Sequence, residues 1–165
     1  MLQFFFYLVL ALLLIFVFSP LFLGVPFLPT HQKQARKMIE LAQIKPGMKV
    51  VDLGSGAGRL LFLSAKSGAE ATGYELNPFL ILWTKMVIFF KRRQNQVKVF
   101  YKSIYKADIS EADVIFLFLY PPHMKKLADK IFMECKPGAK IVSYVFKFPE
   151  RAPILSEEGI FVYEK

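Results

Sequence analysis

The sequence predicts an α/β domain with a doubly wound, mainly parallel sheet, preceded by one apolar N-terminal helix. Two observations carry this prediction. Residues 1–30 contain no charged side chain, so all 22 Lys and Arg and all 13 Asp and Glu residues follow them. Beyond that point, short apolar strands alternate with helical segments, which is typical of a parallel sheet covered on both faces.

Residues 1–23 have the length and composition of a transmembrane anchor. Within the run 2–18 only Gln3 is strongly polar, and about 20 apolar helical residues span a hydrocarbon core. A cleaved signal peptide would need a basic start and a small-residue cleavage site, which this run lacks; a buried core helix is the other alternative. Basic residues begin at Lys33, so the positive-inside rule predicts a single-pass protein whose domain faces the cytoplasm.

Residues 24–30 form a Pro-rich connector, and residues 31–165 form the domain. Thr30 is expected to cap the first helix of this domain. Asn77 is expected to cap a later helix that begins with Pro78. The predicted helices are 31–43, 59–66, 78–93 and 121–135, and the predicted strands are 49–53, 71–76, 97–101, 113–120, 140–148 and a short last one, 160–164.

The charge and the cysteine content narrow the possible partners. The net charge of +9 belongs to residues 31–165, and it would attract anionic lipid or nucleic acid alike. The single cysteine, Cys135, cannot form an internal disulfide, and no Cys/His spacing indicates a metal site. We therefore expect no metal and no structural disulfide.

A glycine-rich loop follows the first strand, in the stretch from Asp52 to Arg59. Its glycines allow a tight turn and a close approach of a ligand, towards which the next helix points its free N–H groups. A dinucleotide loop would have a third glycine where Arg59 stands. The acid at Asp52 suits a positively charged ligand amine and would repel a pyrophosphate. The loop thus favours S-adenosylmethionine, although a purely structural turn is an alternative.

This loop, together with 25–30 and 73–78, resembles the class I methyltransferases. More narrowly, the chain resembles the small protein lysine methyltransferases, which include an archaeal broad-specificity enzyme and membrane-anchored mitochondrial enzymes acting on the ADP/ATP translocase and on the membrane ring of the ATP synthase. The segments 113–120 and 136–143 also carry this resemblance, which covers about residues 24–150. It implies a Rossmann-like fold, S-adenosyl-L-methionine as cofactor, and a lysine side chain of a protein, including an integral membrane protein, as acceptor. It also implies the mitochondrial inner membrane if the source is eukaryotic.

The resemblance assigns cofactor-binding roles by position. The methionine end falls to Asp52, Gly54 and Gly56, and the ribose to Glu75, which can bind both ribose hydroxyls. The remaining members of this predicted set are Asn77 near the ribose, Ser103 and Ile104 beside the adenine, Pro29 and Thr30 closing over the cofactor, and Ser55, Gly58, Arg59 and Leu76.

The sequence departs from the family pattern at two of these places. The family loop usually reads Gly-x-Gly-Asp-Gly, but Ala57 stands where its acid would be, and Ser103 stands where Asp is frequent. A hydroxyl accepts a hydrogen bond more weakly than a carboxylate does. The C-terminal end is also short, since only 160–164 remains where a fuller hairpin often stands.

Tyr120 is the candidate for contacting the acceptor amine, because it follows the fourth strand; a packing role is its alternative. The sequence from Tyr120 to His123 also resembles the Asn/Asp-Pro-Pro-aromatic motif of nucleic acid amino-methyltransferases. Tyr120 substitutes poorly for the polar first residue of that motif, so nucleic acid is not the expected partner. A lipid or quinone acceptor and a catalytically silent cofactor-binding module remain alternatives.

The predicted helix 78–93 has an unusual composition. Its residues 79–90 are apolar on nearly all sides and are followed by Lys91-Arg92-Arg93. Packing against the sheet explains part of this pattern. The alternative is that the outer face enters the interface of an anionic membrane, with the basic cluster at the headgroups.

Overall fold

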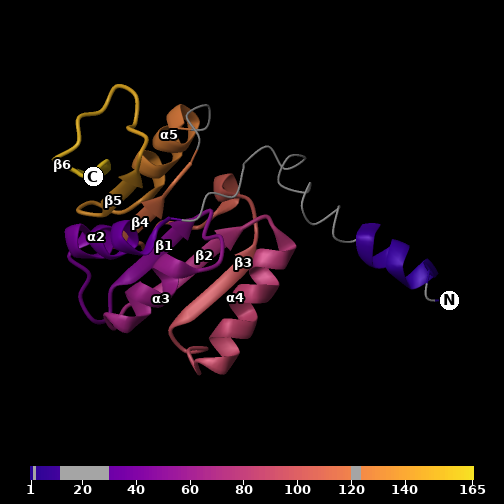
Figure 1. The fold of residues 1–165 in the computed structure, drawn as a ribbon. Coiled ribbons are helices and arrows are strands. Elements are labelled where there is room, and N and C mark those ends of the chain that lie inside the picture. Colours follow the sequence, from indigo (N-terminus) through magenta and orange to yellow (C-terminus); the bar gives the residue numbers. More distant parts are fainter. Residues whose placement is uncertain (2, 12–29, 120–123) are drawn as a thin grey trace.

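The computed structural model describes residues 1, 3–11, 30–119 and 124–165. Residues 3–11 are helical, and the other helices and strands form the domain shown in Figure 1. Most of the predicted anchor and connector lies outside the described residues. No helix within those residues is both long enough and apolar enough to cross a membrane. The anchor therefore stays a prediction.

The domain is built on one sheet. Its strands among the described residues are β1 (Lys49–Leu53), β2 (Glu70–Glu75), β3 (Val97–Tyr101), β4 (Val114–Leu117), β5 (Lys140–Tyr144), β6 (Leu155–Glu157) and β7 (Ile160–Glu164). They lie in the order β3-β2-β1-β4-β5-β7-β6. The pairs among β1 to β5 are parallel, whereas β7 runs antiparallel to β5 and β6. The predicted doubly wound, mainly parallel sheet is confirmed.

Helices cover both faces of the sheet (Figure 1). One face carries α2 (Gln32–Ala42), α3 (Arg59–Lys66) and α4 (Pro78–Phe90), and the other carries α5 (Met124–Glu134) and the short 3-10 helix η1 (Ile104–Lys106). Successive residues of a strand point to opposite faces. Phe116 of β4 accordingly packs with the first group of helices, and Leu117 packs with the second. Burial on both sides explains why β4 has no polar residue.

Several predicted boundaries differ from the structure. The residue that precedes α2 as its cap is His31 rather than Thr30, and it makes no side-chain capping hydrogen bond. The predicted strand 113–120 is shorter, because β4 pairs with β1 only as far as the last register pair, Leu53 with Leu117. The predicted strand 140–148 ends at Tyr144, since Val145 has a left-handed φ of 69°.

The C-terminal end is longer in strand content than predicted. β6 and β7 form an antiparallel hairpin, so the expectation of a single remaining strand is wrong. The turn between them contains Gly159 with a φ of 76°. β6 has only three residues, and all of them are exposed. Such a short exposed strand leaves no apolar alternation in the sequence from which it could be recognised.

The topology places the functional loops at one edge of the sheet. The chain leaves β1 towards β2 on one side and later returns to β4 on the other. Open α/β sheets bind ligands outside the carboxyl ends of their strands, at the point where the strand order reverses. The loops after β1, β2, β3 and β4 therefore form the candidate site.

Candidate functional site

Asp52 is a buried acid near the carboxyl end of β1. Its side chain is only 4% exposed, and it lies in register between Gly73 of β2 and Phe116 of β4. Burial raises the pKa of Asp52 to about 7, and the nearby negative charge of Glu75 contributes to the rise. A buried carboxylate needs a compensating partner. This acid is therefore poised to ionise when a positive group approaches.

The glycine-rich loop is held against β2 by its backbone. The N–H groups of Gly54 and Ser55 both donate to the carbonyl oxygen of Tyr74, at 2.9 and 3.1 Å. Gly54, Gly56 and Gly58 have left-handed φ angles of 82°, 53° and 76°. A side chain at these positions would strain the turn. The predicted loop residues thus occupy the expected place, and the turn needs glycine there.

Glu75 is fixed by three backbone donors at the end of β2. One carboxylate oxygen, Oε2, accepts from the N–H of Gly56 at 2.8 Å. The other, Oε1, accepts from the N–H groups of Leu76 and Asn77, each at 2.8 Å. An ionised carboxylate offers about four acceptor positions, so the group retains capacity for a ligand hydroxyl. Its orientation joins the loop after β1 to the loop after β2.

Asn77 connects this loop to α4. Its side-chain oxygen accepts from the N–H groups of Phe79 and Leu80, at 3.0 and 3.3 Å. The predicted cap is therefore confirmed, and it satisfies two of the free donors at the start of the helix. Asn77 lies beside the ribose-binding candidate because its own N–H bonds to Glu75.

The predicted adenine-side residues lie directly after β3. The Lys102 N–H donates to the backbone oxygen of Glu75 at 3.2 Å, which keeps this stretch near the site. Ser103 caps η1, since its hydroxyl accepts from the Tyr105 N–H at 3.4 Å. Ile104 is the first residue of η1 and is half-buried. A hydroxyl retains a second lone pair and its proton for a ligand.

Two predicted residues meet at the start of the domain. Arg59 donates to the carbonyl oxygen of Thr30, which ties the segment before α2 to the start of α3. Pro29 and Tyr120 fall outside the described residues, so their roles stay predictions. The neighbour of Tyr120, Leu119, is buried, and its Cδ2 atom would lie 3.3 Å from a Cβ atom placed on Gly54.

The structure adds residues that sequence reasoning missed. Thr84 is fully buried in α4, and its hydroxyl donates to the Gly56 carbonyl oxygen at 3.3 Å. A Cβ atom on Gly73 would lie 2.6 Å from the hydroxyl oxygen of Ser55, so only glycine fits there. The Ser55 hydroxyl is itself buried and has no hydrogen-bond partner among the described residues. The signal for Thr84 was present, because it is a hydroxyl residue within an apolar helix.

An aromatic group stands on the neighbouring strands of the sheet. The ring of Phe118, just after β4, meets the ring of Tyr144, the last residue of β5, at a centroid distance of 4.9 Å. Phe146 stacks on Phe118 at 6.3 Å. All three side chains are half-buried. The site therefore has an acidic part after β1 and β2 and an aromatic part after β4 and β5.

The comparison with protein families decides among the classes with this architecture. The family described as the ANTKMT methyltransferase domain matches residues 52–155, which begin at the buried acid and include the whole glycine-rich loop. The chain belongs to this methyltransferase family. The predicted resemblance to the class I methyltransferases is thereby confirmed.

Curated relatives of this ANTKMT-family chain have related names. It is 33% identical over 136 residues to the "Adenine nucleotide translocase lysine N-methyltransferase" of Mus musculus, covering 82% of this chain and 59% of the relative. It is 33% identical over 125 residues to a "Protein-lysine N-methyltransferase" of Saccharolobus islandicus, covering 74% and 78%.

A further group of relatives is named for lysine methylation of the ATP synthase c-ring protein. The chain is 30% identical over 129 residues to the member from Rattus norvegicus, covering 78% of this chain and 59% of the relative. The chain spans only 52% to 59% of the length of the vertebrate members of this group.

A solved structure shares both fold and sequence with the chain. It is the crystal structure of an RNA methyltransferase from Salinibacter ruber in complex with S-adenosyl-L-homocysteine. The TM-score is 0.77 with 32% identity, over 82% of this chain and 91% of that one. The Rossmann-like methyltransferase fold expected for the family is confirmed.

Proposed function

We propose that this chain binds S-adenosylmethionine and transfers its methyl group to lysine side chains of a protein. One observation carries the proposal. The buried acid Asp52 and the backbone-fixed carboxylate Glu75 lie at the ends of adjacent strands, around a loop that only glycines can form. That donor set suits a ligand with a cationic amine and vicinal hydroxyls. The family and the names of the relatives support the same function.

The proposed cofactor contacts follow from the polar groups of the site. Ionised Asp52 would bind the ammonium group of the methionine end, and its raised pKa would fall back as that charge arrives. Glu75 would accept hydrogen bonds from the ribose hydroxyls. Ser103 and Ile104 would flank the adenine, and Thr30 with Pro29 would close over the cofactor. Gly54 and Gly56 would allow the backbone to approach the ligand.

The chain's own part in the reaction is to orient and desolvate the acceptor. When bound, the cofactor supplies a methyl group activated by its sulfonium. A lysine amine must lose its proton before it can attack, and apolar surroundings lower the pKa of an amine. The aromatic group of Phe118, Tyr144 and Phe146 offers such surroundings at the ends of β4 and β5. Tyr120, which follows Phe118 and Leu119 in the chain, is our proposed contact to the acceptor amine.

The membrane part of the proposal rests on the N-terminal sequence. Residues 1–23 would anchor the chain as a single-pass membrane protein, with the domain on the cytoplasmic side because Lys33, Arg36 and Lys37 follow the apolar run. In a eukaryote this would be the mitochondrial inner membrane. The relatives named for the ATP synthase and for the adenine nucleotide translocase support a membrane-embedded protein acceptor.

The test uses the full chain with methyl-labelled cofactor and a membrane extract. Protease-sensitive label recovered on lysine supports the proposal. Label extracted into organic solvent would replace it with a lipid or quinone acceptor, and nuclease-sensitive label with a nucleic acid acceptor. Calorimetry with unlabelled cofactor separates the remaining case. Absence of binding at millimolar cofactor contradicts an enzymatic function, whereas binding without transfer to any fraction indicates a catalytically silent module.

A further inference from the structure

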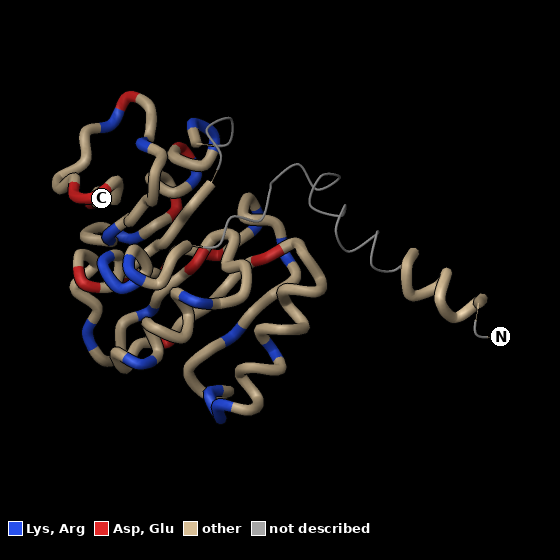
Figure 2. The backbone as a smooth tube through the Cα atoms, in the orientation of Figure 1, with Lys and Arg blue, Asp and Glu red and all other residues tan. Residues whose placement is uncertain are grey.

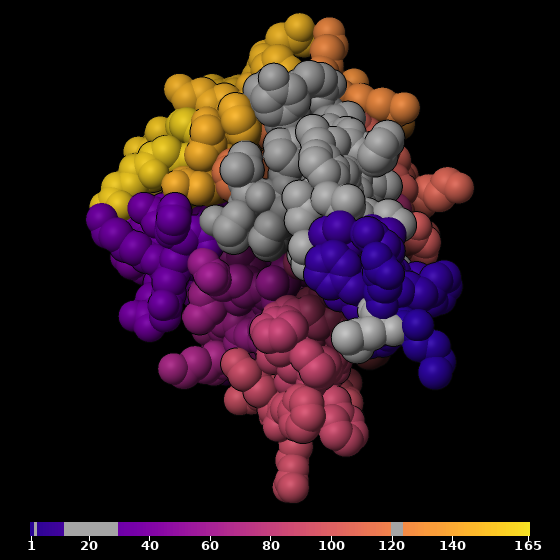
Figure 3. All heavy atoms as spheres, turned by 45° about the vertical axis from the view of Figure 1, so that its right-hand side comes forward, coloured from indigo at the N-terminus to yellow at the C-terminus, as the bar shows by residue number. Residues whose placement is uncertain are grey.

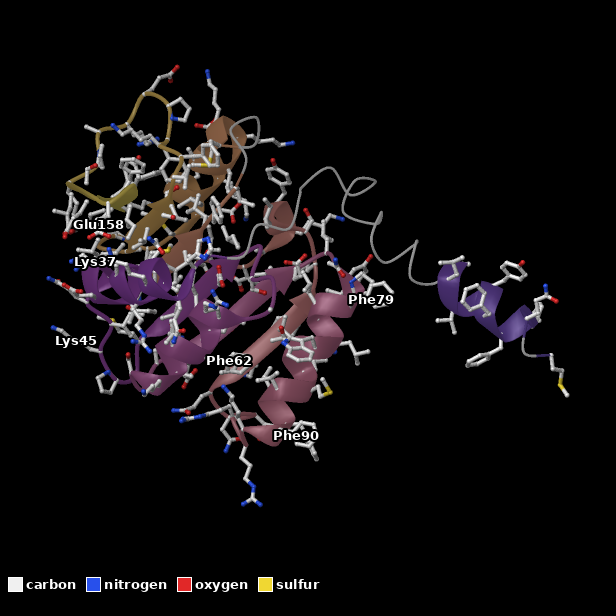
Figure 4. All side chains as sticks on the ribbon, viewed as in Figure 1. Lys37, Lys45, Phe62, Phe79, Phe90 and Glu158 are labelled. Carbon is white, nitrogen blue, oxygen red and sulfur yellow. The ribbon has the colours of Figure 1, made fainter. Side chains whose placement is uncertain are left out.

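The outer side of α4 is apolar and exposed. The helix buries Ile81, Thr84 and Ile88 towards the sheet. Figure 4 shows Phe79 and Phe90, near its two ends, pointing away from the sheet. Intervals of three and four residues place side chains on one face of a helix. This face exposes 42% to 76% of five large side chains, namely Leu82, Trp83, Met86, Phe89 and Phe90.

Basic side chains surround this apolar face. Lys85 lies within the helix, and Lys91, Arg92 and Arg93 follow its last residue. Residues 76–107 contain seven Lys and Arg residues and no Asp or Glu. Figure 2 shows this separation, with blue segments and no red one on α4 and the loop below it. Figure 3 shows α4, in rose, on the surface of the molecule.

We propose that α4 docks on an anionic lipid surface. The docking surface consists of the five exposed apolar side chains together with Lys85, Lys91, Arg92 and Arg93. A large exposed apolar patch marks an interaction site, and an apolar face bordered by Lys and Arg, with Trp at its centre, fits the boundary between headgroups and acyl chains. The 13 residues of α4 extend about 20 Å, so the helix lies along the bilayer rather than across it.

The charge and the side-chain types favour lipid over the other occupants. A second copy of the chain would bring the same basic residues against each other, which is unfavourable. A nucleic acid would accept the charge, and its bases would stack on the aromatic rings, but Leu82 and Met86 provide no stacking surface. Anionic lipid satisfies both halves of the docking surface, because its headgroups pair with the cations and its chains cover the apolar side chains.

Docking would place the candidate cofactor site next to the bilayer. The first residue of α4 follows Asn77, whose N–H bonds to Glu75. Lipid contact along α4 therefore holds this rim of the site near the membrane surface. The inference is independent of the proposed methyl transfer, since it can be tested without cofactor.

Trp83 provides a direct reporter, because it is the single tryptophan of the chain and is 52% exposed. The full chain is reconstituted in phosphatidylcholine vesicles with or without phosphatidylserine, each also prepared with brominated acyl chains. Insertion of the N-terminal segment alone leaves Trp83 in water. We expect a blue-shifted emission and strong quenching by bromine in the vesicles that contain phosphatidylserine, and much weaker effects in those without it.

A charge-neutralising variant tests the basic half of the surface. Each basic residue near an anionic surface contributes about fivefold to binding. Lys91→Gln, Arg92→Gln and Arg93→Gln together should therefore weaken docking roughly 100-fold and return the quenching to its value in phosphatidylcholine. The matched control replaces three exposed lysines outside α4 by Gln, at Lys125, Lys126 and Lys147, and should leave the quenching unchanged.

Three results would overturn the inference. Trp83 emission could be the same in both kinds of vesicle, or the control variant could lose quenching as fully as the α4 variant does. Alternatively, single-stranded RNA could shift the emission where phosphatidylserine vesicles do not, which would assign this face to nucleic acid. None of these results affects the methyltransferase proposal, which is tested by transfer of label.

Discussion

Cofactor affinity should depend on pH through Asp52. The fold gives this acid a pKa of about 7, chiefly because it is buried. If the cofactor's ammonium pairs only with the ionised carboxylate, the protonated fraction of the protein cannot bind well. The affinity should then increase from pH 6 to pH 8 and level off above that. The perturbation that isolates this group is Asp52→Asn, which keeps the shape and removes the titration.

The magnitude follows from the pKa of Asp52. With a pKa of about 7, about one molecule in eleven is ionised at pH 6 and about ten in eleven at pH 8, so binding should be about tenfold weaker at pH 6. At pH 7, binding should release about half a proton, which calorimetry in two buffers of different ionisation enthalpy measures. The Asp52→Asn variant should bind more weakly throughout and lose this proton release.

The stability of the cofactor-free protein provides a second measure of the same pKa. The folded pKa of Asp52 lies above the ordinary value of 3.8. The protonated form is therefore the stable one, and the free energy of unfolding should decrease between pH 4 and pH 7, by about 4 kcal/mol at most. Asp52→Asn should remove this decrease and melt at a higher temperature than the parent at pH 8. Affinity and stability that are both independent of pH would refute the reasoning.

Three further substitutions test the site. Gly73→Ala should lower the melting temperature, because its Cβ atom would lie 2.6 Å from the Ser55 hydroxyl oxygen, and overpacking costs about 1–3 kcal/mol; thermal unfolding measures this. Glu75→Gln should weaken cofactor binding roughly 10- to 100-fold in calorimetry, since one charged acceptor is lost, whereas Glu70→Gln, at the exposed start of the same strand, should not. Ser103→Asp should strengthen binding several-fold, because a carboxylate is the better acceptor, and a weaker affinity would contradict the assigned adenine contact.

The parts of the fold that depend on neighbouring residues could be predicted from the sequence. β1, α3 and β3 have the predicted bounds, because each is a compact apolar segment between clear turn residues. The cap at Asn77 is also local, since it involves only the next few backbone N–H groups. The glycine-rich loop belongs with them, because the left-handed turns at Gly54, Gly56 and Gly58 require glycine whatever lies around them.

Features that depend on distant partners could not be predicted in this way. β4 ends at Leu117 because its partner β1 ends at Leu53, although the apolar sequence continues. Thr30 has a capping side chain but lies one residue too early, and the structure shows its carbonyl oxygen bonded to Arg59 instead. The three donors to Glu75 come from two different loops, so only the folded chain reveals that its carboxylate is immobilised.

Thr84 links the two proposals through a single helix. Its hydroxyl bond to the Gly56 carbonyl oxygen attaches the middle of α4 to the loop that would hold the cofactor. The same buried position sets the rotation of the helix, and therefore directs Trp83 and Met86 outward. A rotation that buried this apolar face would break the bond and disturb the loop. The exposed apolar face is thus a consequence of how α4 supports the cofactor site, and the membrane offers a way to cover that face without moving the helix.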